Sequence, residues 1–238
     1  MKLVIGGATG FVGREVLRQA LNSPEITSIV TIGRRPVTVV DSTNIAKLTD
    51  IVMEDGEHYS ESDIEKIANA DACIWTIAVA RTKALTTPFD ICKKVTRDYT
   101  LAGIDALTKS NNKGKPLRFI YMSGVAISRD MNQDFRKWDK TTSPEMHQLR
   151  CMLEIELVSY ASNSKGKVEI CCVRPGYIAG DREIPGWVPP NIPEGIPQIE
   201  RRDLVAACLK MGIDGIEKDP LSNDDAVRIG EEALGRFG

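Results

Sequence analysis

The sequence MKLVIGGATGFVG occupies residues 1–13, and it decides the fold. Residues 3–5 are apolar and uncharged, as in a short buried strand. Glycines follow at positions 7, 10 and 13, and residues 14–21 have the spacing of a helix with one apolar face. A strand, a glycine turn and a helix in this order provide the context that a dinucleotide-binding motif requires.

The glycine spacing has a physical purpose in such a motif. Glycine allows a tight turn and a close approach to a pyrophosphate, and the helix N-terminus offers unpaired N–H groups and a positive dipole end. Ala8 stands where the commonest form has its second glycine, which leaves the spacing G-x-x-G-x-x-G. A glycine-rich turn that binds nothing is the alternative, and the flanking strand and helix disfavour it. The residues that we expect to contact a dinucleotide here are Gly7, Ala8, Thr9, Gly10, Phe11 and Val12.

The length and charge of the chain limit the classes of protein to consider. A chain of 238 residues can form one sizeable α/β domain. We therefore expect a single NAD(P)-binding domain over residues 1–238, with a substrate-side loop and terminal helices in residues 180–238. The net charge of −2 and the lack of a basic block disfavour nucleic acid or an anionic membrane as a partner. No apolar run is long enough for a membrane span and no signal peptide is recognisable, so we expect a cytoplasmic protein.

The cysteines and histidines do not form a metal-binding pattern. None of the six cysteines belongs to a C-x-x-C motif, and His58 and His147 lie far apart in the sequence. We expect reduced, mostly buried thiols and no metal site.

Strand patterns alternate with helix patterns along the chain. The strands predicted after the first one cover residues 28–32, 51–53, 72–79, 118–122 and 168–173. The helices predicted after the first one cover residues 61–70, 89–109, 145–161, 202–211 and 223–234. This alternation predicts an α/β fold with a doubly wound parallel sheet of the Rossmann type and right-handed crossovers, followed by a small C-terminal substrate-side region.

Two arginines, Arg34 and Arg35, follow the second predicted strand. An NAD-preferring site carries an acidic residue at this place, about 20 residues beyond the glycines. A guanidinium instead suits a 2′-phosphate by charge and by bidentate geometry, so we expect NADP(H) as the cofactor. A pair of solvated loop charges is the alternative. Asp55, which follows the third strand, can accept a hydrogen bond from an adenine amino group.

Further contacts are expected where the later strands end, because ligands of parallel sheets bind at the carboxyl ends of the strands. The residues expected at these ends are Ile77, Ala78, Val79, Met122, Pro175, Gly176, Tyr177 and Ile178. Arg81 can reach a phosphate or an anionic substrate, or it can remain a solvated charge. Trp138 and Trp187 can line a pocket for an apolar or aromatic ligand.

Five motifs together resemble a known group of proteins. They are Gly-Ala-Thr-Gly-Phe-Val-Gly, Ile-Gly-Arg-Arg, Arg-Asp-Tyr, Tyr-Met-Ser-Gly and Val-Arg-Pro-Gly. The chain thereby resembles the atypical short-chain dehydrogenase/reductases of the NmrA-like NAD(P)H-binding type, from residue 1 to about residue 180 and again over residues 203–206. The resemblance implies a Rossmann fold whose cofactor lies across the carboxyl ends of the strands. Redox-active members of the superfamily use a serine, a tyrosine and a lysine.

The chain departs from that pattern at the catalytic residues. Ser123 matches the serine, which in the family holds the carbonyl oxygen, but Met146 and Arg150 stand where the tyrosine and the lysine are expected. A thioether cannot donate a proton, and an arginine cannot lose one. Arg150 can still bind ribose or nicotinamide-side oxygens, as the family lysine does. His147 can serve as the acid, or it can be a surface residue, since it points about 100° away from Met146 on a helix.

Three functions remain open at this stage. The first is an NADP(H)-dependent oxidoreductase that acts on a small organic substrate, with an aromatic substrate among the options. The second is a regulatory protein that senses NADP(H) without turnover, and the third is a non-redox isomerase or cyclase. The expected partner is a small molecule in each case, and the sequence leaves the oligomeric state open.

Overall fold

The computed structural model describes residues 1–38, 44–133, 142–180, 192 and 194–237. Seven parallel strands form one sheet in the order β3-β2-β1-β4-β5-β6-β9. The strands are β1 (Lys2–Gly6), β2 (Ser28–Gly33), β3 (Leu48–Val52), β4 (Ala72–Trp75), β5 (Leu117–Met122), β6 (Val168–Arg174) and β9 (Leu221–Ser222). The expected Rossmann-type α/β fold is confirmed. The strand order reverses between β1 and β4, which is where such sheets bind ligands.

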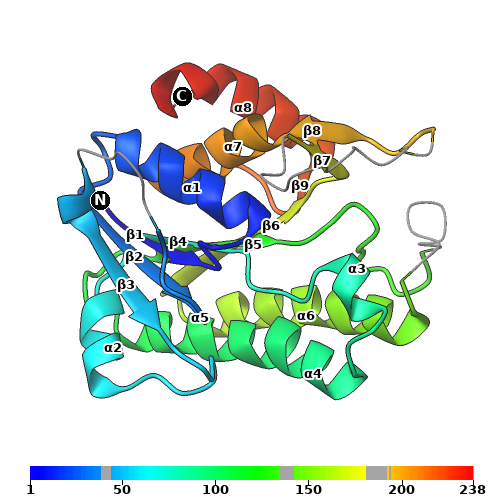
Figure 1. Cartoon of the computed structure of the whole chain (residues 1–238), viewed down its shortest axis with the longest axis horizontal. Helices are drawn as coiled ribbons and strands as arrows, with labels where there is room; N and C mark the ends of the chain where they lie inside the picture. The colour runs from blue at the N-terminus through cyan, green and yellow to red at the C-terminus, as the bar shows by residue number, and fades with distance from the viewer. Residues whose placement is uncertain (39–43, 134–141, 181–191, 193, 238) are drawn as a thin grey trace.

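Helices cover both faces of the sheet (Figure 1). One layer contains α1 (Phe11–Asn22), α7 (Arg201–Asp214) and α8 (Asn223–Phe237). The other layer contains α2 (Glu61–Ile67), α4 (Phe89–Lys93), η2 (Lys94–Asp98), α5 (Tyr99–Lys109) and α6 (Pro144–Asn163). Each layer packs against the sheet through its own cluster of buried aliphatic and aromatic side chains. The sheet is therefore apolar on both faces, as a doubly wound fold requires.

The terminal helices complete the first layer. α7 lies between α1 and α8 and also contacts β4 and β5. Smaller elements are α3 (Arg81–Ala84), η1 (Ile45–Lys47) and a two-stranded sheet of β7 (Tyr177–Ala179) and β8 (Gln198–Glu200). Trp138 and Trp187 lie outside the described residues. Within the described ranges, no helix combines the length and the apolarity that a membrane crossing requires.

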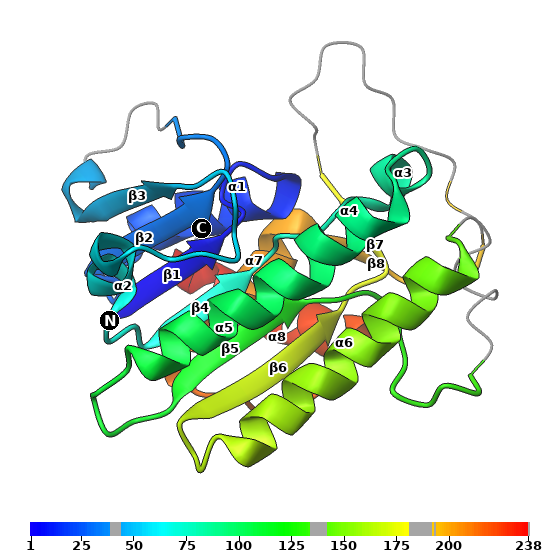
Figure 2. The same cartoon turned by 90° about the horizontal axis from the view of Figure 1, so that it is seen from below.

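One strand and one helix beside the second layer differ in detail from the sequence prediction. The fourth strand ends at Trp75, four residues before the predicted end, and beyond it the Val79 N–H bonds to the Thr96 hydroxyl (3.3 Å). The predicted helix over residues 89–109 is continuous, but it contains the π-helical turn η2 at Thr96. Figure 2 shows this helix crossing the sheet beside α6. Such turns often occur at functional sites.

Candidate functional site

A cavity of about 460 Å³ opens at the carboxyl ends of β1, β2 and β4. The glycine turn, the segment after β2, the segment after β4 and the start of the helix over residues 89–109 all contribute to its wall. Of the residues predicted to bind a cofactor, those that line the cavity are Gly7, Thr9, Gly10, Arg34, Arg35, Ile77, Ala78 and Val79. The segments that follow β1, β2, β3 and β4 and the start of the helix over residues 89–109 thus meet at the switch point of the sheet.

The glycine turn is closed by backbone contacts that exclude side chains. Gly7 has φ +85° and donates its N–H to Ile32 O (2.9 Å). A Cβ atom at Gly13 would lie 2.1 Å from Gly7 O, so only glycine fits there. Gly10 is the N-cap of α1 and has no side chain to satisfy the first N–H groups of that helix. Gly7, Thr9 and Gly10 line the cavity directly before this helix N-terminus, and the turn therefore fits a pyrophosphate.

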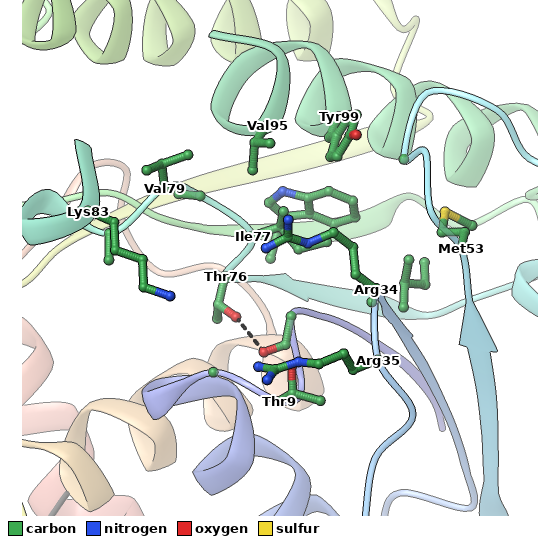
Figure 3. A pocket seen from close by; sticks show the side chains of 18 of the residues that line it. Thr9, Arg34, Arg35, Met53, Thr76, Ile77, Val79, Lys83, Val95 and Tyr99 are labelled. Carbon is green, nitrogen blue, oxygen red and sulfur yellow. Dashed lines mark hydrogen bonds between the residues drawn. The ribbon is translucent and has the colours of Figure 1, made fainter. Parts of the chain in front are cut away.

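The charged side chains that the described part of the cavity wall contains are cationic. Arg34 and Arg35 extend from the end of β2, and Lys83 of α3 extends from the opposite side (Figure 3). All three are exposed, and no ion pair of theirs occurs within the described part of the chain. No aspartate or glutamate is among the described residues of the wall. The cavity therefore favours a polyanionic ligand.

The floor of the cavity is aromatic. Trp75 is buried there, and its indole N–H donates to the Thr100 hydroxyl (2.9 Å), which in turn donates to Thr96 O (2.7 Å). Tyr99 and Tyr59 lie in the same wall. The Tyr59 hydroxyl is buried without a hydrogen-bond partner among the described residues, and burial raises the pKa of this phenol. A flat ring that carries a polar edge would complement this floor.

Hydrogen bonds to the backbone N–H and C=O of Val79 hold the segment after β4 in place. The Val79 N–H donates to Thr96 Oγ1 (3.3 Å), and Val79 O accepts from Arg150 Nη2 (2.9 Å). Arg150, which stands at the position of the family lysine, thus binds the backbone of the cavity wall. The guanidinium positions this segment from α6.

Ser123 follows the end of β5 and lies in a polar network with Glu154 of α6 and Arg174 of β6. Its hydroxyl donates to Glu154 Oε1 (2.5 Å), and Glu154 is fully buried. Arg174 binds both oxygens of Glu154 (3.1 and 2.5 Å), and Arg129 Nε lies 3.2 Å from Oε2. The buried carboxylate is thereby compensated by two guanidiniums.

Met146 and His147 occupy different environments. Met146 is 4% exposed and packs with Cys92 and Leu149. His147 Nε2 lies 3.3 Å from the Cys151 sulfur, and burial raises the pKa of the Cys151 thiol. Neither Met146 nor His147 is among the described residues of the cavity wall.

The other predicted contacts lie around the cavity. Asp55 accepts hydrogen bonds from Glu57 N and from Lys94 Nζ (both 3.1 Å), which lower the pKa of its carboxyl group. Ala8 and Val12 are buried, the latter in the first turn of α1, and Phe11 packs against the Arg201 guanidinium. Outside the wall as the structure describes it are Ala8, Phe11, Val12, Asp55, Arg81, Met122, Ser123, Arg150, Pro175, Gly176, Tyr177 and Ile178. The segment from Gly176 leads into β7, and Gly176 N donates to Asn223 Oδ1 (3.0 Å).

Several wall residues were missed by sequence reasoning. They are Ile32, Gly33, Met53, Gly56, Tyr59, Trp75, Thr76, Ala80, Lys83, Thr87, Ile91, Val95 and Tyr99. One signal was available, because Thr96 and Thr100 lie four residues apart on one face of a predicted helix and are unusual on a buried face.

Comparisons with known proteins agree with this geometry. The sequence model of the NAD(P)H-binding family matches residues 7–211. The chain is 27% identical over 177 residues to "Protein fmp52, mitochondrial" of Emericella nidulans. That alignment covers 74% of this chain and 66%, slightly under two thirds, of the relative.

Solved structures share the fold at low sequence identity. A UDP-glucose 4-epimerase from Thermotoga maritima has a TM-score of 0.67 and 14% identity, with 100% of this chain and 84% of that chain covered. A nucleoside-diphosphate-sugar epimerase from Agrobacterium tumefaciens has a TM-score of 0.66 and 17% identity, with 90% and 69% covered. The match of the family over most of the chain, glycine turn included, confirms the resemblance inferred from the motifs: the chain belongs to the NAD(P)H-binding family.

Proposed function

We propose that the protein is an NADP(H)-dependent oxidoreductase that acts on a small organic substrate. The observation that carries the choice of NADP(H) is the cavity wall, which contains Arg34 and Arg35 and no carboxylate among its described residues. A 2′-phosphate needs compensation of its charge, whereas the 2′-hydroxyl of NAD(H) needs an acceptor such as a carboxylate. The described wall offers two guanidiniums for a 2′-phosphate and no carboxylate for a 2′-hydroxyl.

Different residues of the site would bind different parts of the dinucleotide. The N–H groups at the start of α1 would hold the pyrophosphate, and Arg34 with Arg35 would hold the 2′-phosphate. Trp75 and Tyr99 would contact a ring of the dinucleotide, with the unpaired Tyr59 hydroxyl as a further polar contact. Arg150 would keep the Val79 segment in place beside it. When bound, the dinucleotide supplies or accepts a hydride.

A second candidate function is a sensor that binds NADP(H) without turnover. The observation in its favour is Met146, which is buried among apolar side chains where the family has its proton-donating tyrosine. Reduction of a carbonyl requires a proton for the oxygen that becomes negative. Steady-state oxidation of NADPH against a panel of aldehydes and ketones separates the two functions. Tight NADPH binding with no turnover over the whole panel would favour the sensor.

The cofactor preference is tested by calorimetric titration of NADPH and NADH. We expect tighter binding of NADPH, by about tenfold or more, since a charge-assisted bond to phosphate is worth about 1.5–3 kcal/mol. Arg34→Ala and Arg35→Ala should each weaken NADPH binding and leave NADH binding nearly unchanged. Arg228→Ala, on the distant exposed face of α8, is the matched control. Equal affinities of the wild-type protein for the two cofactors would contradict the proposal.

A further inference from the structure

The hydroxyl of Ser123 has a defined direction. Its single proton lies on the contact with Glu154 Oε1, at 2.5 Å between the oxygens. A carboxylate has no proton to give, so in this pair the serine must be the donor. The Ser123 oxygen then presents only lone pairs to any other partner.

Glu154 is surrounded by hydrogen-bond donors and cationic side chains. It is fully buried, and Arg174 binds it through Nε and Nη2 (3.1 and 2.5 Å). Arg129 Nε lies 3.2 Å from Oε2 and is anchored by two hydrogen bonds to Asp219 (2.8 and 2.9 Å). In this network the oxygens of Glu154 accept from Ser123 and Arg174 and lie beside Arg129. The direction of the Ser123 hydroxyl is therefore set by Glu154 together with Arg174 and Arg129.

Ser123 lies close to the cavity. Glu154 follows Arg150 by four residues on α6, so the two side chains leave the same face of the helix about 6 Å apart. Arg150 bonds to Val79 of the cavity wall, and Glu154 bonds to Ser123, which is partly exposed at the end of β5. β5 is the neighbour of β4, whose end forms part of the same wall.

We propose that Glu154 is a positioning residue that makes Ser123 a hydrogen-bond acceptor, and that the substrate group which Ser123 binds is therefore a donor, a hydroxyl or an amino group. A carbonyl oxygen has no proton and cannot occupy that place while Ser123 bonds to Glu154. Of an alcohol and the corresponding ketone, the site holds the alcohol more tightly. The statement about substrate rests on the proposed function, whereas the direction of the hydroxyl does not.

Neutron diffraction from deuterium-exchanged crystals of the wild-type protein tests the direction of the hydroxyl. We expect the deuterium of Ser123 on the line to Glu154 Oε1. A deuterium that points away from Glu154, or a deuterium bound to Glu154, overturns the proposal. This measurement needs neither substrate nor variant, so it stays decisive even if buried-charge variants fail to fold.

The ligand class is tested with Glu154→Gln. In this variant the amide oxygen keeps the place of Oε2 beside Arg174 Nη2 and Arg129, and the amide N–H₂ takes the place of Oε1, where it gives up the bond from Arg174 Nε and donates to Ser123. The serine proton then turns outward. Ligand-observed NMR with matched alcohol and ketone pairs, taken from those that the wild-type protein binds, gives the ratio of affinities. We expect the ratio to favour the alcohol in the wild-type protein and to fall by about tenfold in Glu154→Gln.

Two controls interpret the ratio. Ser123→Ala should remove the preference without reversing it, and Glu154→Asp, which keeps the charge, should retain its sign. A ketone preference in the wild-type protein, or the same ratio in Glu154→Gln, overturns the proposal. NADPH titration of the wild-type protein is run in parallel. Loss of the proposed function would appear there as absent binding, with the neutron result unaffected.

Discussion

Trp75 illustrates how single residues shape the cavity. Its indole is 1% exposed, and its N–H group has no access to water, so the Thr100 hydroxyl is its hydrogen-bond acceptor. The Thr100 hydroxyl donates a hydrogen bond to Thr96 O, and the Thr96 hydroxyl accepts one from the Val79 N–H. Two threonines one helical turn apart thereby fix both the floor of the cavity and the segment beside it.

Substitution of Thr100 by Val tests this arrangement. The change keeps the shape of the side chain but leaves the buried indole N–H without a partner, which should cost about 1–3 kcal/mol of unfolding free energy. Chemical denaturation followed by tryptophan fluorescence measures the loss. Thr49→Val on the exposed side of β3 is the control, and it should stay within about 0.5 kcal/mol. An equally small effect at Thr100 would mean that the bond does not contribute.

Arg150 and Met146 show what a motif can and cannot reveal. Their positions on α6 follow from the sequence register, and the loss of the proton-donating tyrosine is visible without a structure. The bond of Arg150 to Val79 O is not, because it joins residues 71 positions apart and depends on how α6 lies against the end of β4. The direction of the Ser123 hydroxyl depends in the same way on Arg129 and Arg174.

Among the secondary-structure elements, the turn between β1 and α1 separates binding from stability. A Cβ atom at Gly10 would meet only Gly7 O, at 3.2 Å, whereas one at Gly13 would meet the same oxygen at 2.1 Å. Gly10→Val should therefore fold, with a cost of about 1 kcal/mol for a poorer N-cap, and lose at least about tenfold in NADPH affinity. Gly13→Val should lose at least about 3 kcal/mol of stability.

Circular dichroism, thermal unfolding and calorimetry on the two variants check this contrast. Both place a branched side chain in the same turn, so each serves as the control of the other. Undiminished NADPH binding by a folded Gly10→Val protein would show that the turn has a structural role alone.

Helix α1 also carries a pH-dependent contact. Glu15 is 7% exposed; burial opposes its charge, but hydrogen bonds from Arg18 (2.7 Å) and Gln19 (2.8 Å) outweigh burial and lower the pKa of the carboxyl group. A lowered pKa in the folded state means that Glu15 stabilises the protein above its unfolded pKa, about 4.3. The contribution is lost as the pH falls through the lower, folded value.

Comparison of Glu15→Gln with the wild-type protein should show this dependence. We expect the variant to be less stable by about 1–2 kcal/mol at pH 7 and the difference to shrink steadily below about pH 4. Urea denaturation at a series of pH values gives the difference directly. A gap that stays constant down to pH 3 would contradict the assignment.

For the molecule as a whole, the last residues described belong to the core. Phe237, at the end of α8, is 1% exposed and packs into the same cluster as β1 and α1. Phe237→Ala should therefore cost about 3–5 kcal/mol, even though it lies near the C-terminus. Thermal or chemical denaturation measures this, with Phe89→Ala, at a residue that is 44% exposed, as the control. A loss below about 1 kcal/mol would show that the end of α8 frays readily.

The sheet was predictable from the sequence because its pattern is local. Each strand is an apolar run, each crossover is a helix with one apolar face, and topology rules then limit the strand order. β7, β8 and β9 were missed because two or three residues carry too little pattern to detect. The cavity wall was predicted in part, since its glycines and arginines follow strand ends, whereas its aromatic floor depends on how β4 packs against the helix over residues 89–109.

The position of Trp75 restricts how this sequence can change over evolution. A Cβ atom at Gly6 would lie 2.6 Å from the indole, and one at Gly103 would lie 2.5 Å from its other edge. The ring therefore fills the space that two neighbouring backbones leave by having no side chain. Replacement of either glycine becomes acceptable only after the tryptophan has given way to a smaller residue. We therefore expect the residues at positions 6, 75 and 103 to vary together in related sequences. Where a smaller residue replaces the tryptophan, neither glycine is required to make room for the indole.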